Sequence, residues 1–173
     1  MAVEVIDHSG LDDPSGPIAD LVEAVLDAEG VAGGVVIAFV DEQAMTDLNS
    51  RYRGVGEPTD VLSFRYSEDE AEWPGHPQVR RMLGDESVRA GAALDLGEIV
   101  ICPDVVRGYA EDEGRGARIQ LAWTLVHGVL HLVGYDHEQD EGGMREREQV
   151  LLERFSRLVG KVPSPRPAAE ITE

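Results

Sequence analysis

The sequence predicts an α+β fold with α/β character, in which a small mixed sheet of four strands packs against about five helices. Two observations support this prediction. Strand-like and helix-like segments alternate in the first half of the chain, and helices accumulate in the second half. The longest run without an acidic residue, lysine or arginine extends from Ile119 to Tyr135. It is shorter than the roughly 20 residues that a bilayer requires, so it predicts a buried central helix.

Four short segments have the composition of strands. Residues 3–6 alternate, and residues 35–40 are almost entirely apolar, as expected of a strand that is covered on both faces. Residues 60–64 and 96–102 complete the predicted sheet. Glu98 interrupts the apolar run of the last segment, and the sequence leaves open whether it marks a sheet edge or a functional site.

Five helices are predicted from the spacing of apolar residues and from residues typical of helix ends. Ser15 and Pro17 suit a helix start, Asp41 is an N-cap residue, and Pro103 fits a first helical turn. The predicted helices cover residues 15–29, 41–52, 103–113, 117–133 and 141–158, and the fourth of these is the central helix.

The length of 173 residues suits a single domain, which we place at residues 1–160. Residues 67–93 are poor in apolar periodicity and begin with an acidic stretch, which predicts a mobile insert. The last residues, 161–173, are rich in proline and are predicted to form a disordered tail.

Charge and cysteine content restrict the partners and the compartment. The net charge is −19, which excludes diffuse electrostatic adhesion to nucleic acid or to an anionic membrane. The basic residues are 14 arginines and Lys161, so any contact with nucleic acid must be local and based on arginine. Cys102 is the single cysteine and is expected to be a small buried residue, so no internal disulfide can form. We therefore expect a cytoplasmic protein without a membrane partner.

Three histidines within eleven residues predict a metal site. His127 and His131 are spaced to share one face of a helix, about 5–6 Å apart at Cβ. Gly134 can end that helix in a left-handed conformation, which turns His137 back toward the same face. Three imidazoles can then hold one zinc ion and leave a fourth position open. Asp136 could be a hydrogen-bond partner of an imidazole or a turn residue.

The residue after the first histidine bears on the chemistry of this site. The spacing H-x-x-x-H-x-x-G-x-x-H equals that of the metzincin peptidases, in which a glutamate follows the first histidine and acts as the base. Gly128 occupies that position here, so the proton delivery that amide cleavage needs is missing. Phosphodiester cleavage depends on charge stabilisation at phosphorus, which a metal ion and an arginine can provide.

A second group of residues, LNSRYRGVGEPTDVLSF at 48–64, contains two candidate phosphate ligands. Arg51 and Arg53 precede a Gly/Pro turn, and either could bind a phosphate bidentately. Arginines at a helix C-terminus also interact favourably with the helix dipole, so composition alone leaves both roles open.

The stretch 48–64, together with LGEIVIC at 96–102 and HGVLHLVGYDH at 127–137, resembles the bacterial YbeY family of rRNA maturation endoribonucleases. The resemblance implies one zinc ion on His127, His131 and His137, and an essential arginine at Arg53 across a cleft from the metal. It implies cleavage of single-stranded RNA in 16S rRNA 3′-end maturation and in ribosome quality control. The chain departs from the family at Arg65, where proline is usual, and in the length of 67–93. A catalytic base is not evident.

The sequence therefore predicts a zinc-dependent endoribonuclease with Arg53 as a catalytic residue and Arg51 as an RNA contact. The expected partners are rRNA in the small ribosomal subunit, with ribosomal proteins or an assembly GTPase, and no DNA. The alternative is a non-catalytic ribosome assembly factor whose zinc is structural. A third reading, a metallopeptidase, is weakened by Gly128.

Overall fold

The computed structural model describes residues 3–9, 15–65, 95–135 and 142–165, which form four strands and six helices. The strands are β1 (Val3–Asp7), β2 (Gly34–Phe39), β3 (Val61–Arg65) and β4 (Asp95–Ile101). The helices are α1 (Ser15–Ala28), α2 (Glu42–Arg53), α4 (Pro103–Glu113), α5 (Ala117–Leu132), α6 (Gly143–Arg154) and α7 (Ser156–Val159). The predicted mobile insert at 67–93 lies outside the described residues.

The four strands form one mixed sheet in the order β1-β2-β4-β3. β1 pairs with β2 and β2 with β4 in parallel, whereas β3 runs antiparallel to β4. The predicted four-stranded mixed α+β fold is confirmed. β4 is an inner strand, so Glu98, which is 1% exposed, does not lie at a sheet edge.

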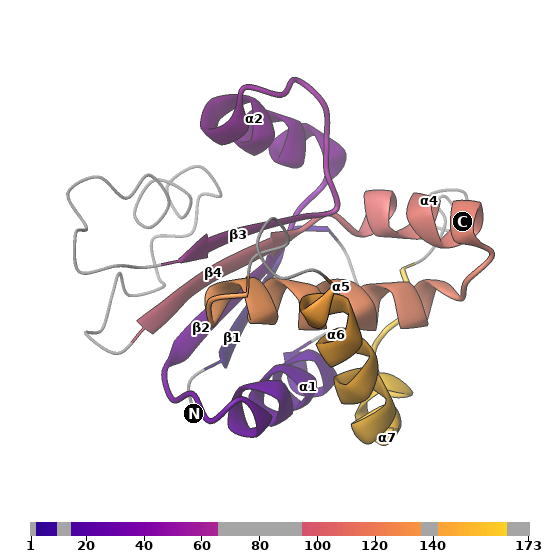
Figure 1. The fold of residues 1–173 in the computed structure, drawn as a ribbon. Helices are drawn as coiled ribbons and strands as arrows, with labels where there is room; N and C mark the ends of the chain where they lie inside the picture. Colours follow the sequence, from indigo (N-terminus) through magenta and orange to yellow (C-terminus); the bar gives the residue numbers. More distant parts are fainter. Residues whose placement is uncertain (1–2, 10–14, 66–94, 136–141, 166–173) are drawn as a thin grey trace.

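Helices cover both faces of the sheet, as Figure 1 shows, with α2 on one side and α1 and α5 on the other. The α2 face is a small apolar cluster that includes Met45 and Leu48 of α2 with Leu62, Phe64 and Val100 of the sheet. The larger core lies on the opposite face, where side chains of α1, β2, β4 and α5 pack together. No helix in the described ranges is long and apolar enough to cross a membrane.

α5 is the buried central helix that the charge-free run predicted. It packs directly on the sheet at Gly128, where a Cβ atom would lie 2.9 Å from Cγ2 of Ile99. The Ser63 hydroxyl of β3 donates to the Gly128 carbonyl at 3.2 Å. The side chain after His127 therefore points toward the sheet, and a glutamate there would meet Ile99 and Ser63.

The C-terminal part of the chain differs from the prediction in two respects. The helix expected at 141–158 is two helices, α6 and α7, separated at Phe155. This break brings α7 against α1 and buries Val159 in the core. The disordered tail predicted from residue 161 does not include Val162, which is fully buried and whose carbonyl accepts a hydrogen bond from Nε of Arg118 at 2.7 Å. Residues 166–173 lie outside the described residues.

Other element boundaries agree with the prediction to within one or two residues. The third strand ends at Arg65, which pairs with Gly97 of β4.

Candidate metal centre and adjoining groove

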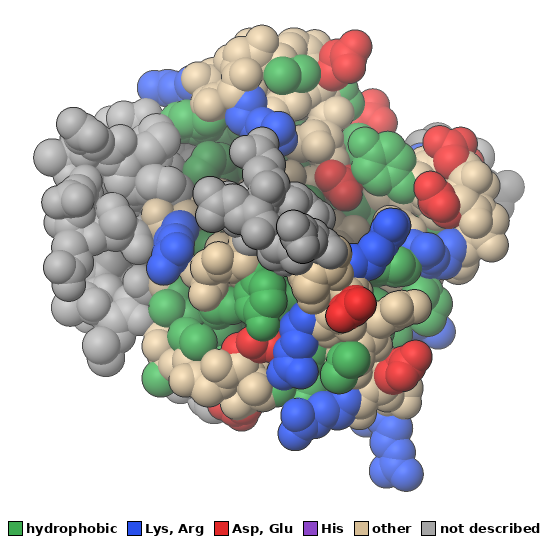
Figure 2. All heavy atoms as spheres, viewed as in Figure 1, with side chains coloured by type: hydrophobic (Ala, Val, Ile, Leu, Met, Phe, Trp, Pro, Cys, Tyr) green, Lys and Arg blue, Asp and Glu red, His purple; other side chains and the backbone are tan. Residues whose placement is uncertain are grey.

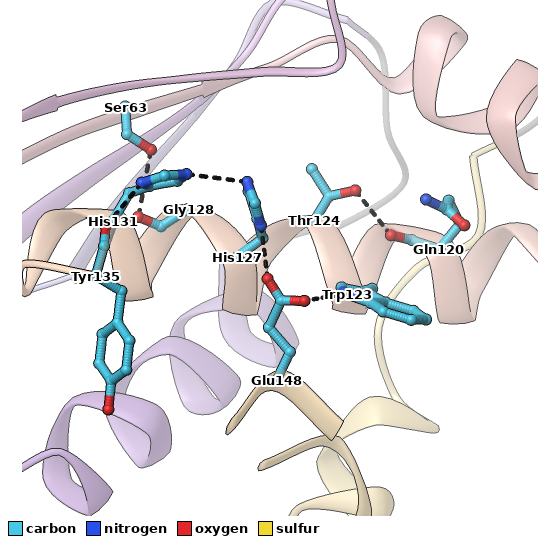
Figure 3. A network of polar contacts seen from close by, with 9 residues as sticks. All are labelled: Ser63, Gln120, Trp123, Thr124, His127, Gly128, His131, Tyr135 and Glu148. Atoms are coloured by element: carbon cyan, nitrogen blue, oxygen red, sulfur yellow. Dashed lines mark hydrogen bonds and ion pairs between the residues drawn. The ribbon is translucent and has the colours of Figure 1, made fainter. Parts of the chain in front are cut away.

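His127 and His131 lie one turn apart on α5, and their imidazole rings point toward each other (Figure 3). The two Nε2 atoms are 3.1 Å apart, and the ring planes are inclined at 83° with centroids 4.6 Å apart. The predicted helical pair is therefore present, with both Nε2 atoms directed at one point.

Hydrogen bonds at the opposite side of each ring fix the tautomers. Nδ1 of His127 lies 2.6 Å from Oε1 of Glu148, and Nδ1 of His131 lies 3.0 Å from the carbonyl oxygen of Tyr135. A carbonyl oxygen accepts only, as does an ionised carboxylate, so each Nδ1 carries the proton. A neutral imidazole that is protonated at Nδ1 has its lone pair at Nε2, which is the form that binds a metal ion.

Two facing lone pairs suit a shared cation. Two nitrogen ligands of a tetrahedral zinc ion, each 2.0–2.1 Å from the metal, would lie roughly 3.3 Å apart, close to the separation found here. An Nδ1–H donated to a carboxylate and to a backbone carbonyl is also the usual outer arrangement of metal-binding histidines. The residues present thus fit a zinc ion. His137 lies outside the described residues, and among those described no three His, Cys, Asp or Glu side chains gather as a metal site.

The support of His131 is the local turn after α5. Gly134 has φ of +110°, its N–H bonds to the carbonyl of His131, and the N–H of Tyr135 bonds to the carbonyl of Leu130. These two bonds form a Schellman motif, which ends a helix through a residue with positive φ. The turn predicted at Gly134 is therefore confirmed, and it places the Tyr135 carbonyl beside Nδ1 of His131.

The support of His127 comes from another helix and was missed in the sequence. Glu148 of α6 is 3% exposed and holds His127 through Oε1, while Oε2 accepts from Nε1 of Trp123 at 2.6 Å. Its signal was its helical spacing, because Glu148 lies on the inward face between buried Met144 and Leu151. Asp136, the partner suggested from the sequence, lies outside the described residues.

A groove of about 540 Å³ opens over the histidine pair. Its lining includes His127 and His131 from α5, Ser63 and Arg65 from β3, and Arg53 from the end of α2. Asp41 caps the start of α2 through a 2.8 Å bond to the N–H of Ala44, and Gly54 ends the helix with φ of +70°. Arg53 is thereby held at the point where the chain leaves α2 for β3.

The two predicted arginines occupy different surroundings. Arg53 is exposed and shares the groove with the histidines. The guanidinium of Arg51 lies 5.8 Å from the ring centroid of Tyr52 and does not line this groove. Arg65, which sequence analysis treated as a departure in the strand, is a second groove arginine.

Glu98 and Cys102 lie on the α2 face, away from the histidines. Glu98 pairs in register with Phe64. Burial raises the pKa of the nearby Tyr52 phenol, partly offset by the charge of Arg51 and reinforced by that of Glu98. Burial raises the pKa of the Cys102 thiol to about 11, in agreement with the small buried residue that was expected. Neither side chain reaches the groove beside His127.

The fold and this site define an α+β protein with a candidate metal centre in an arginine-containing groove. The family model described as endoribonuclease YbeY matches residues 13–156, which is most of the chain. The chain belongs to the endoribonuclease YbeY family.

Individual relatives match over most of their length. Endoribonuclease YbeY of a Roseiflexus species is 38% identical over 143 residues, covering 80% of this chain and 81% of the relative. The Frankia alni protein of the same name is 36% identical, covering 97% of this chain and 90% of the relative. The solution structure of TM1509 from Thermotoga maritima has a TM-score of 0.60 at 23% identity and covers 92% of this chain and 90% of that one, which supports the fold.

Proposed function

We propose that this chain is a zinc-dependent endoribonuclease that cleaves single-stranded RNA in 16S rRNA 3′-end maturation and ribosome quality control. The observation that carries the proposal is the pair of Nε2 atoms, 3.1 Å apart, in a groove that Arg53 also lines. Membership of a family described as endoribonucleases supports the reaction class.

His127 and His131, with His137 from the part of the chain outside the described residues, would hold the ion. When bound, zinc supplies Lewis-acid polarisation of a phosphoryl oxygen. Glu148 and the Tyr135 carbonyl keep both imidazoles in the tautomer that binds metal. Gly128 allows α5 to approach β4 closely enough to place the pair beside β3.

Arg53 would bind the phosphate that is cleaved. A guanidinium donates two parallel N–H bonds, which suits two non-bridging phosphate oxygens as negative charge develops. Arg65 adds a second positive charge to the same groove, and Ser63 offers a hydroxyl between the strand and the histidines. These contacts are local, as a chain with a net charge of −19 requires.

The proposed substrate is rRNA of the small ribosomal subunit, reached with the help of ribosomal proteins or an assembly GTPase in the cytoplasm. Protein partners suit an acidic chain, since they can bring RNA to arginines that would not attract it from a distance. No membrane or DNA partner is proposed.

The test is single-turnover cleavage of a single-stranded RNA at saturating zinc by the wild type and by Arg53→Ala. We expect the variant to fold, to bind zinc and to lose about 10²–10³-fold in rate, as loss of a charge-stabilising donor does. Arg53→Lys should not restore the rate, because an ammonium cannot donate bidentately. Arg157→Ala, at an exposed position of α7 that lines neither this groove nor any predicted site, is the control and should retain activity.

An Arg53→Ala rate within about threefold of the wild type would remove Arg53 from the mechanism, since the expected loss is far larger. That result would favour a non-catalytic assembly factor with structural zinc.

A further inference from the structure

A second groove, of about 630 Å³, lies on the other side of His127. Helices α4, α5 and α6 contribute Tyr109, Trp123 and Arg145 to it, and the turn between α4 and α5 contributes Arg115. Asp60 and His127 line both this groove and the one that contains Arg53. An RNA strand whose reacting phosphate lies at the histidines would therefore have a neighbouring nucleotide beside the second groove.

Arg115 and Trp123 form a flat, fixed surface in this groove. The guanidinium carbon of Arg115 lies 4.1 Å from the ring centroid of Trp123, and Nη1 donates to Oε1 of Gln120 at 2.9 Å. The indole is held in turn by its hydrogen bond to Glu148. Such a surface needs little ordering when a planar group stacks on it, and RNA bases stack on both aromatic rings and guanidinium planes.

The charges of the groove favour a base over a phosphate. Asp60, Glu113 and Glu148 line it together with Arg115 and Arg145, so positive and negative groups are mixed. Figure 2 shows the same mixture on this face of the molecule, where arginines are interspersed with acidic side chains. For a phosphate, three carboxylates oppose the attraction of the two arginines, whereas a neutral base meets no such repulsion and its amino groups could donate to the carboxylates.

Tyr109 supplies a second aromatic side chain at this groove. It is 43% exposed and lies on α4. Partial burial and the nearby Asp60 and Asp112 raise the pKa of its phenol, so the ring remains neutral at physiological pH. A neutral exposed ring is available for contact with a base.

We infer that the groove between α4, α5 and α6 binds the base of the nucleotide next to the cleaved bond, stacked on the Arg115–Trp123 surface. This inference rests on the proposed endoribonuclease function and extends it by a binding site for one base. Arg115 and Trp123 contact substrate here, whereas Arg53 contacts the phosphate that reacts.

The test is equilibrium binding of a fluorescent, uncleavable 2′-O-methyl oligonucleotide to the zinc-loaded chain, followed by anisotropy. Arg115→Ala should weaken binding by about tenfold, the scale of one lost stacking contact, and Trp123→Leu should do the same. Arg157→Ala on α7, which lines neither groove, is the control and should bind as the wild type. Zinc content and thermal unfolding check that each variant is intact.

A single abasic position moved along the probe separates base stacking from phosphate binding. With the abasic site at the position that occupies the groove, wild type and Arg115→Ala should bind equally. If the Arg115→Ala loss persists for every abasic position, or if no loss occurs, the base site is refuted.

Binding and cleavage results distinguish this inference from the proposed function. The expected binding pattern without any RNA cleavage would overturn the nuclease and keep the base site. Arg53-dependent cleavage with wild-type binding by Arg115→Ala and Trp123→Leu would keep the nuclease and overturn the base site.

Discussion

The two histidines of the candidate metal centre are supported in different ways. His131 is held by the backbone carbonyl of Tyr135, within the turn that ends its own helix. His127 is held by the buried carboxylate of Glu148, a residue of α6 that is 21 positions further along the chain. The first support forms with the end of α5, and the second requires α6 to pack against α5.

This difference separates what local sequence specifies from what tertiary packing specifies. A glycine at the start of a turn is sufficient to place a carbonyl near His131. The carboxylate of Glu148 accepts hydrogen bonds from both His127 and Trp123, so one residue of α6 positions two side chains of α5. The support from α6 should therefore be the more costly one to remove.

The largest effect is expected for Glu148→Ala. The change leaves Nδ1 of His127 and Nε1 of Trp123 without their acceptor, at a cost of up to about 1–3 kcal/mol for each of these partly buried donors. Zinc affinity should fall by about 10–100-fold, as when an outer partner of a metal ligand is removed. Competition with a chromophoric chelator measures the affinity, and urea unfolding of the metal-free chain measures the stability.

Two variants of α6 sharpen this test. Glu148→Gln keeps one acceptor oxygen and should lose less affinity than Glu148→Ala. Glu146→Ala, at an exposed position of the same helix, should change neither quantity. Equal zinc affinity for Glu148→Ala and Glu146→Ala would show that His127 does not depend on α6.

A smaller effect is expected for Gly134→Ala. A residue with a Cβ at φ of +110° is strained, so unfolding free energy should fall by about 1–2 kcal/mol, and zinc affinity should fall less than in Glu148→Ala. Gly160→Ala is the matched control, because Gly160 has φ of −64° and ordinary space for a Cβ. Thermal unfolding of both variants makes the comparison, and an equal response would contradict the role of the turn.

The smallest effect is expected for Tyr135→Phe. The variant loses the 3.2 Å hydrogen bond from the phenol to Glu29, which costs about 0.5–1.5 kcal/mol, while Arg147 still contacts Glu29 at 2.6 Å. The backbone carbonyl that holds His131 remains, so zinc affinity should not change. A marked loss of affinity on chelator titration would mean that the tyrosine side chain, not the turn, positions His131.

The sequence predicted the features whose signals are local. Apolar periodicity and end signals placed the sheet and most helices, and the i, i+4 spacing predicted the histidine pair on α5. The break at Phe155 was not predicted, because the apolar period continues through it and the contacts of α7 with α1, α5 and α6 form only in the folded chain.

The rest of the site depends on residues brought together from distant parts of the chain. In the sequence, Glu148 is one of 34 acidic residues and nothing in composition distinguishes it. Its role follows from its burial in the folded chain. Arg65 joins the groove because β3 runs beside α5, and Arg115 stacks on Trp123 because the chain turns between α4 and α5. Spacing along the sequence does not specify such contacts. The one signal it offered was that Glu148 lies between the apolar residues Met144 and Leu151 on the inward face of α6.

The most direct measurement is the zinc content of the purified chain beside that of the His127→Ala, His131→Ala double variant, by elemental analysis after removal of free metal. The two facing Nε2 lone pairs predict one zinc ion per wild-type chain and none in the folded double variant. Equal zinc content in the two proteins, or a wild-type chain that retains no zinc after loading, would contradict the account.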